Sequence, residues 1–121
     1  AMAMAQTPQW KSPAGRTYLS QADNADLKAL QEKAGANAKD AAAQIALGRG
    51  YDRLLQFDRS IPVYSKLIRE SPGDVQAYRY RGHRYISTRK FADAVKDLQQ
   101  ARKIAPGSFD VLYHLGLAQY L

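Results

Sequence analysis

Apolar residues recur at helical spacing along most of this chain, and each such segment is bounded by residues that start or stop a helix. Leu27, Leu30 and Ala34 follow one another at intervals of three and four residues, and similar stripes continue towards the C-terminal end. The pattern predicts helices at about residues 21–34, 41–55, 58–70, 75–88, 91–104 and 109–121. No segment alternates with a period of two residues, so we expect no β-strands.

Residues that accept hydrogen bonds from unpaired backbone N–H groups precede several of these segments. Ser20, followed by Asp23, resembles a capping box for the first helix. Asp40, Asp74 and Ser108 occupy the same place before three later helices. These residues indicate where the helices begin.

The chain repeats with a period of 34 residues. A shift by 34 positions aligns three glycines with one another and two prolines with each other: Gly48, Gly82 and Gly116, and Pro72 and Pro106. A glycine inside a helix costs about 1 kcal/mol relative to alanine, so it indicates that a facing helix approaches closely. We therefore expect antiparallel helix pairs that stack on one another, with Gly48 and Gly82 at tight crossings.

This repeat resembles the tetratricopeptide repeat, whose pattern is W-x-x-L-G-x-x-Y, then A-x-x-x-F, then A and P. The matching positions are Gly48, Tyr51, Pro72, Gly82, Tyr85, Ala94, Pro106 and Gly116. Gln44, Ser60 and Arg81 depart from the residues that are usual at their positions. The resemblance implies an all-α fold, a right-handed α-solenoid of antiparallel helix-turn-helix repeats.

The expected organisation is a disordered or extended arm at 1–19, followed by one repeat domain at 20–121. The domain would comprise a degenerate half repeat or capping helix at 20–38, repeats at 41–74 and 75–108, and the first helix of a truncated repeat at 109–121. The apolar residues of this last helix have no partner helix in the sequence. We expect missing repeat structure or another chain to cover them, including a second copy in a homo-oligomer; a frayed, partly exposed end is the alternative.

Composition and charge restrict the function. The chain has 18 basic and 11 acidic residues, a formal net charge of +7, two histidines and no cysteine. Residues 75–108 carry eight basic and two acidic side chains, so the excess positive charge is local. There is no glycine-rich phosphate loop, no nucleophile elbow and no convincing set of metal ligands. We expect no catalytic residues, no cofactor and no metal site, and no apolar run approaches the roughly 20 residues of a membrane helix.

The resemblance to tetratricopeptide repeats implies that the first helices of successive repeats line a concave groove, where peptides of partner proteins bind. The groove-facing residues that stand out are Arg49, Arg53, Arg79, Tyr80, His83, Tyr113 and His114. Arginine pairs with carboxylates and tyrosine supplies rigid contact area, which favours an acidic or C-terminal peptide as the ligand. The alternative is that these are solvated side chains on an open surface.

Members of this family that bind chaperones use a carboxylate clamp of Lys and Asn, then Asn, then Lys and Arg, on three successive first helices. The corresponding residues in this chain are Ile45, Arg49, Tyr80, Asp110 and His114, and none of them matches. We therefore do not expect the acidic tail of a chaperone as the ligand. A scaffold or adaptor that binds another protein partner is the favoured function.

Two further hypotheses concern the same helices. His83 and His114 should lie close together, either as a pH-sensitive or weak metal-binding pair or only as polar surface. The run Tyr78–Tyr85 alternates basic and aromatic residues, which can contact phosphates and stack on bases. Because a helix spreads this run around its circumference, nucleic-acid or polyanion binding through 75–108 ranks below peptide binding.

The N-terminal segment offers one indication of the compartment. Ala5–Gln9 is the kind of segment that follows a cleaved secretory signal, although no charged or apolar signal region accompanies it. This hint favours a soluble, exported bacterial protein of the periplasm, and no other feature of the sequence indicates a compartment.

Overall fold

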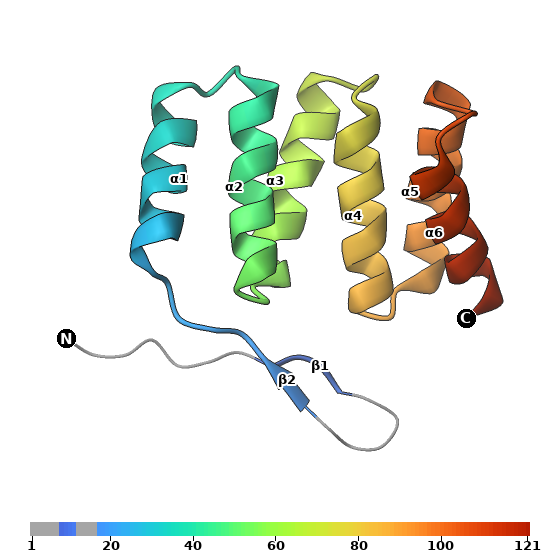
Figure 1. The fold of residues 1–121 in the computed structure, drawn as a ribbon, viewed down its shortest axis with the longest axis horizontal. Helices are drawn as coiled ribbons and strands as arrows, with labels where there is room; N and C mark the ends of the chain where they lie inside the picture. Colours follow the sequence, from blue (N-terminus) through green and yellow to red (C-terminus); the bar gives the residue numbers. More distant parts are fainter. Residues whose placement is uncertain (1–7, 12–16) are drawn as a thin grey trace. The chain divides into compact units, whose positions relative to one another are not determined.

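A computed structural model describes residues 8–11 and 17–121, and in this part of the chain it contains six α-helices and two short β-strands (Figure 1). The helices are α1 (Ala25–Ala36), α2 (Ala41–Arg53), α3 (Phe57–Glu70), α4 (Val75–Ser87), α5 (Phe91–Ile104) and α6 (Phe109–Tyr120). The strands are β1 (Pro8–Lys11) and β2 (Thr17–Leu19). All six predicted helices are confirmed, with ends that differ from the prediction by a few residues.

The expectation that the chain has no strands is wrong for the residues before α1. β1 and β2 pair antiparallel, with Trp10 opposite Tyr18 and Lys11 opposite Thr17. Backbone groups form the ladder, and strands of four and three residues are too short to show a period of two in the sequence. The rest of the predicted arm, 1–7 and 12–16, lies outside the described residues, together with most of the segment that suggested export.

Polar side chains begin α2, α4 and α6 at the predicted places. The Asp40 carboxylate accepts hydrogen bonds from the first backbone N–H groups of α2, at 3.0 and 3.4 Å. Asp74 does the same for α4 at 3.0 and 3.2 Å, and the Ser108 hydroxyl accepts from the Val111 N–H at 3.4 Å. The capping box predicted at Ser20 is wrong, because α1 starts behind Asn24, whose Oδ1 accepts from the Leu27 N–H at 2.9 Å.

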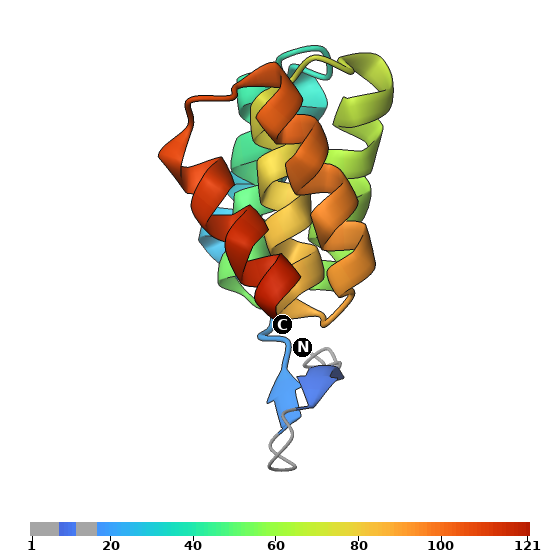
Figure 2. The same ribbon diagram turned by 90° about the vertical axis from the view of Figure 1, so that its right-hand side faces the viewer.

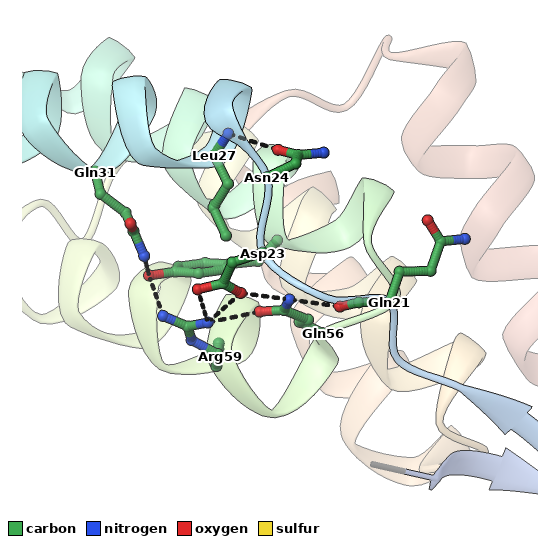
Figure 3. A network of polar contacts seen from close by, with 8 residues as sticks. Gln21, Asp23, Asn24, Leu27, Gln31, Gln56 and Arg59 are labelled. Atoms are coloured by element: carbon green, nitrogen blue, oxygen red, sulfur yellow. Dashed lines mark hydrogen bonds and ion pairs between the residues drawn. The ribbon is translucent and has the colours of Figure 1, made fainter. Parts of the chain in front are cut away.

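Contacts with the turn between α2 and α3 explain the later start of α1 (Figure 3). The backbone N–H of Gln21 donates to the Leu54 carbonyl at 2.7 Å, and Gln56 Nε2 donates to the Gln21 carbonyl and to Asp23, both at 2.8 Å. Arg59 Nη1 donates to Asp23 Oδ1 at 2.9 Å. The hydrogen bonds from Gln56 and Arg59 lower the pKa of Asp23. Tertiary partners thus occupy the Asp23 carboxylate, which the predicted capping box would use.

The chain divides into two compact units, residues 1–63 and 64–121, with the boundary inside α3. In the first unit α1 packs against α2, around a core formed by Leu27, Tyr51 and Leu54. In the second unit α5 packs against both α4 and α6 (Figure 2). The core of this unit consists of Ala94, Leu98, Leu115 and Ala118.

The tight crossing predicted at Gly82 is confirmed. A Cβ atom at Gly82 would lie 2.8 Å from Leu98 Cγ, so the glycine allows α5 to approach α4. Gly48 is buried in α2, and its tight crossing stays a prediction. A second close approach, between α1 and α2, is at Gly50, where a Cβ would lie 2.6 Å from Leu30 Cδ1. Gly116 has the same repeat position as Gly82, yet no atom lies within 4 Å of a Cβ built there.

Candidate functional site

Five of the seven predicted groove residues lie in the second compact unit. Arg79, Tyr80 and His83 belong to α4, whereas Tyr113 and His114 belong to α6. We call these five residues the α4–α6 cluster. Arg49 and Arg53 are exposed on α2, in the first unit, and their membership of a common groove stays a prediction.

Two cross-helix contacts connect α4 and α6, one helical turn apart. Arg79 Nη1 donates to Asp110 Oδ2 at 3.2 Å, and the His83 and His114 rings lie 4.5 Å apart, centroid to centroid. Residues four apart share one face of a helix, so each helix contributes both of its residues from a single face. The predicted proximity of the two histidines is confirmed.

The guanidinium of Arg79 is already oriented within the cluster. Its Nε donates to Gln76 Oε1 at 2.8 Å, and its Cζ lies 4.5 Å from the centre of the Tyr80 ring. Tyr80 in turn stacks on Tyr64, with ring centroids 5.8 Å apart. The ion-pair partner Asp110 has a side chain that is 65% exposed, and ion pairs in such water-accessible positions contribute only about 0–1 kcal/mol. A carboxylate of a ligand can therefore compete with Asp110 for Arg79.

Hydrogen bonds assign different roles to the two imidazoles. Arg84 Nη2 lies 2.7 Å from His83 Nδ1, and because a guanidinium only donates, this nitrogen accepts and the proton of neutral His83 is on Nε2. His114 Nδ1 lies 2.7 Å from the Asp110 carbonyl oxygen, so this nitrogen donates. The pair thus offers one N–H donor, on His83, and one acceptor nitrogen, on neutral His114.

Burial is the main reason why His83 remains neutral. Burial, together with smaller electrostatic contributions from Arg84, His114 and Arg79, lowers the pKa of His83 to about 4. The usual value for histidine is about 6.5. At neutral pH the cluster therefore carries the charges of Arg79 and Asp110, with an uncharged imidazole on α4.

We expect the stability of the chain to fall as the pH is lowered from about 6.5 to about 4. Between these values the unfolded state binds a proton at His83 that the native state does not bind, so the free energy of unfolding rises with pH in this window. Because His83 is only partly buried, solvent screening limits the loss to roughly 1–2 kcal/mol. Urea unfolding at several pH values should show this loss, and His83→Gln should reduce it; an unchanged pH profile in the variant would contradict the assignment.

The metal-binding form of the histidine hypothesis is untested and stays a prediction. The bond from Arg84 uses the Nδ1 lone pair of His83, and the Nε2 atom of that ring carries the proton. Within the described residues no group of three or more histidine, aspartate or glutamate side chains is arranged around a common point.

Arg81, in the middle of the basic and aromatic run, belongs to a partly buried network of hydrogen bonds that the sequence did not predict. Its Nε and Nη2 donate to the two Asp97 oxygens, both at 2.7 Å, and its Nη1 donates to Ser65 Oγ at 3.1 Å. The hydrogen bonds that Arg81 donates to Asp97 raise the pKa of Arg81. The signal in the sequence was the departure from the usual leucine at position 81. All three arginines of the run already have partners within the chain: Arg81 binds Asp97, Arg79 binds Asp110 and Arg84 binds His83. A polyanion would have to compete with these partners for each arginine.

None of the helices in residues 25–120 has both the length and the apolar character needed to cross a lipid bilayer.

No family model matches this chain, and no curated protein matches it in sequence. Several solved structures are similar to it. The first TPR domain of Spaghetti (RPAP3), bound to the HSP90 peptide SRMEEVD, has a TM-score of 0.73 at 17% identity, over 78% of this chain and 75% of that chain. The first TPR domain of human RPAP3 has the same TM-score and identity, over 78% and 74% of the two chains.

A third similar structure, the TPR domain of Arabidopsis OM64, has a TM-score of 0.73 at 17% identity and covers 78% of each chain. Each of these three similarities covers 78% of this chain. The helical part of this chain therefore has the tetratricopeptide-repeat fold.

Proposed function

We propose that this chain is a non-catalytic scaffold or adaptor module that binds a peptide of a partner protein at the α4–α6 cluster. The observation that carries the proposal is the pair of contacts between the two helices, Arg79 with Asp110 and His83 with His114. They hold a cation, aromatic rings, an N–H donor and an acceptor nitrogen on one surface. A peptide requires this combination, because its backbone and side chains offer both donors and acceptors.

An acidic peptide fits this surface best. Arg79 is held against Tyr80, so little side-chain entropy is lost when it binds a carboxylate, and charge-assisted hydrogen bonds are about twice as strong as neutral ones. The acceptor nitrogen of His114 can receive a backbone N–H of the same peptide. Tyr113, whose side chain is 59% exposed, adds apolar contact area beside these polar groups.

Similar structures support the class of ligand and also show where this chain differs. The first TPR of Spaghetti is bound to SRMEEVD, and the second TPR domain of human RPAP3 is in complex with the HSP70 peptide SGPTIEEVD. Both peptides contain two glutamates and end in aspartate. This chain has Tyr80, Asp110 and His114 at three of the positions that form a carboxylate clamp in chaperone-binding repeats. We therefore propose an acidic partner peptide that is not the tail of a chaperone.

A peptide array probed with the whole chain tests this function. We expect acidic peptides to bind about tenfold more tightly than the same peptides with Glu and Asp replaced by Gln and Asn, since one charge-assisted bond contributes about 1.5–3 kcal/mol. Arg79→Gln should abolish the preference. Asp110→Asn should strengthen acidic binding several-fold, because it removes the internal competitor for Arg79.

Arg102→Gln is the matched control, since Arg102 is an exposed arginine on α5 and the substitution removes the same charge. It should leave the preference unchanged when affinities are measured by fluorescence anisotropy. If no acidic preference is found, or if Arg102→Gln weakens binding as much as Arg79→Gln, the α4–α6 cluster is not the binding site.

Polyanion binding is the second candidate, favoured by one feature of α5. An open depression of about 550 Å³ is lined by Gln99, Arg102, Lys103 and Pro106, so two cations border it. If this candidate holds, single-stranded DNA should bind with an affinity that falls steeply with salt. Arg102→Gln should then weaken DNA binding more than Arg79→Gln does.

A further inference from the structure

The two imidazoles of the α4–α6 cluster differ in how easily each can take up a proton. His83 Nδ1 accepts a hydrogen bond from Arg84 Nη2 at 2.7 Å. A proton on this nitrogen would set one donor against another and one cation against another, so the bond would be lost. Burial also opposes a charge on this ring and lowers the pKa of His83 to about 4. His83 therefore stays neutral in mildly acidic solution.

His114, in contrast, can become charged without losing a hydrogen bond. Its Nδ1 donates to the Asp110 carbonyl oxygen at 2.7 Å, and this nitrogen carries a hydrogen in the neutral ring and in the charged ring. The incoming proton goes to Nε2, which changes from an acceptor into a donor. The bond to the Asp110 carbonyl holds the imidazole in place in both states, so protonation changes the chemistry of the cluster and not its geometry.

The charged and titratable groups around His114 come from α4 and from α6 itself. On α4, Arg79 forms an ion pair of 3.2 Å with Asp110, and the His83 ring, bound to Arg84, lies 4.5 Å from the His114 ring. On α6, Asp110 precedes His114 by four residues and shares its face of the helix. The core between α5 and α6 is apolar and contains Ala94, Leu98, Leu115 and Ala118.

A proton on His114 changes the charge of the surface that Arg79 and Asp110 form. With neutral imidazoles the charges of these two residues cancel, whereas a charged His114 leaves one positive charge in excess. The new Nε2–H group is a charge-assisted donor, which binds a carboxylate about twice as strongly as a neutral donor does. The cluster then offers two cationic donors to an acidic ligand where it offered one.

We propose that the α4–α6 cluster binds acidic peptides more tightly in mildly acidic solution than at neutral pH, because His114 takes up a proton and becomes a second cation beside Arg79. This inference rests on the proposed function, since it concerns the same ligand at the same site. A histidine side chain ordinarily changes its charge between about pH 8 and pH 5. The carboxylates of a peptide have pKa values of about 4, so the ligand remains an anion over most of this range.

Fluorescence anisotropy at about pH 8 and about pH 5.5, at constant ionic strength, tests the proposal. The probes are the acidic peptide that binds most tightly to the whole chain in an array screened at both pH values, and its counterpart with Gln and Asn. Each carries a rhodamine label, whose emission does not change in this range. We expect the acidic peptide to bind about tenfold more tightly at the lower pH, since one charge-assisted hydrogen bond is gained, and the counterpart to show no such gain.

Calorimetry provides a second readout that reports the proton directly. At about pH 6.5, binding of the acidic peptide should take up protons, which makes the measured heat depend on the ionisation enthalpy of the buffer. His114→Gln should remove both the proton uptake and the pH response of the affinity. His114→Lys carries a permanent charge, so it should bind at about pH 8 as tightly as the wild type binds at about pH 5.5.

Two further variants exclude other sources of the pH response. Arg102→Gln, on the exposed side of α5, should respond to pH as the wild type does. Asp110→Asn is needed because a proton on Asp110 would also release Arg79 to the ligand. The pH response should persist in this variant, and its loss would assign the effect to the carboxyl group. Circular dichroism at both pH values checks that each variant is folded.

The possible failures of this inference and of the proposed function can be distinguished. A pH response that survives His114→Gln contradicts the inference, as does an acidic preference in the wild type that is equal or weaker at the lower pH. These results leave the proposed function in place. If acidic peptides are not preferred at either pH, the proposed function fails and the inference fails with it.

Discussion

Asp97→Ala is expected to lower the free energy of unfolding by about 3 kcal/mol, measured by urea or thermal unfolding. The side chains of Asp97 and Arg81 are only 7% and 19% exposed, and two hydrogen bonds of 2.7 Å join them. Without the carboxylate, the Arg81 guanidinium keeps Ser65 as its hydrogen-bond partner but stays partly buried with an unbalanced charge. The loss comes from this desolvated charge more than from the broken bonds themselves.

The double variant Asp97→Ala with Arg81→Leu should recover most of this stability, to within about 1 kcal/mol of the wild type. It removes both charges and restores the leucine that is usual at this repeat position. A coupling energy of about 2 kcal/mol between the two substitutions would follow. Asp110→Asn, which breaks an exposed ion pair, is the control and should cost less than about 1 kcal/mol. If the double variant is less stable than Asp97→Ala alone, the desolvation argument is wrong.

Gly82→Val is expected to destabilise the chain by about 2–3 kcal/mol, because the new Cβ would lie 2.8 Å from Leu98 Cγ and 3.3 Å from Asp97 Cβ. Leu98 is fully buried, and Asp97 is held by Arg81, so neither can move away at little cost. The higher helix propensity of valine offsets only a few tenths of a kcal/mol. The free energy of unfolding in urea measures the net effect.

Gly116→Val supplies the matched comparison for Gly82→Val. The residue type, the helix position within the repeat and the substitution are the same, but no side chain or neighbouring element lies within 4 Å of the new Cβ. At protein concentrations where the chain is monomeric, the free energy of unfolding should change by less than about 0.5 kcal/mol. Equal costs at the two glycines would mean that backbone preference, and not the approach of α5, accounts for Gly82.

Local features of the sequence were sufficient to predict the helices. The period of 34 residues, the caps Asp40, Asp74 and Ser108 and the apolar stripes all act within a few residues of one another, and the helices begin where these features place them. The resemblance to tetratricopeptide repeats could be recognised for the same reason, since its signature is a set of short spacings. The predicted capping box failed because residues distant in the sequence bind its acidic side chain. Asp23 accepts hydrogen bonds from Gln56 and Arg59 and does not cap a helix.

For the candidate site, helical spacing was enough to predict that His83 and His114 meet, because the repeat places equivalent turns of α4 and α6 side by side. It did not reveal that Arg79 is paired with Asp110, which makes the surface less positive than the run of arginines suggests. Nor did it distinguish Arg79, which is available to a ligand through an exposed partner, from Arg81, which is sequestered by Asp97.

The amino-acid sequence by itself determined the repeat, its helices and the residue types on their faces, because these depend on backbone propensity, capping and periodic burial over short distances. Only the tertiary structure decided which glycine receives a neighbouring side chain and which arginine is paired with a buried carboxylate. Gly82 and Gly116 illustrate the reason: they are equivalent in the repeat, yet Leu98 packs on the first and no atom approaches the second. Such differences depend on the side chains that a neighbouring helix places against each glycine. These side chains come from residues that are distant in the sequence.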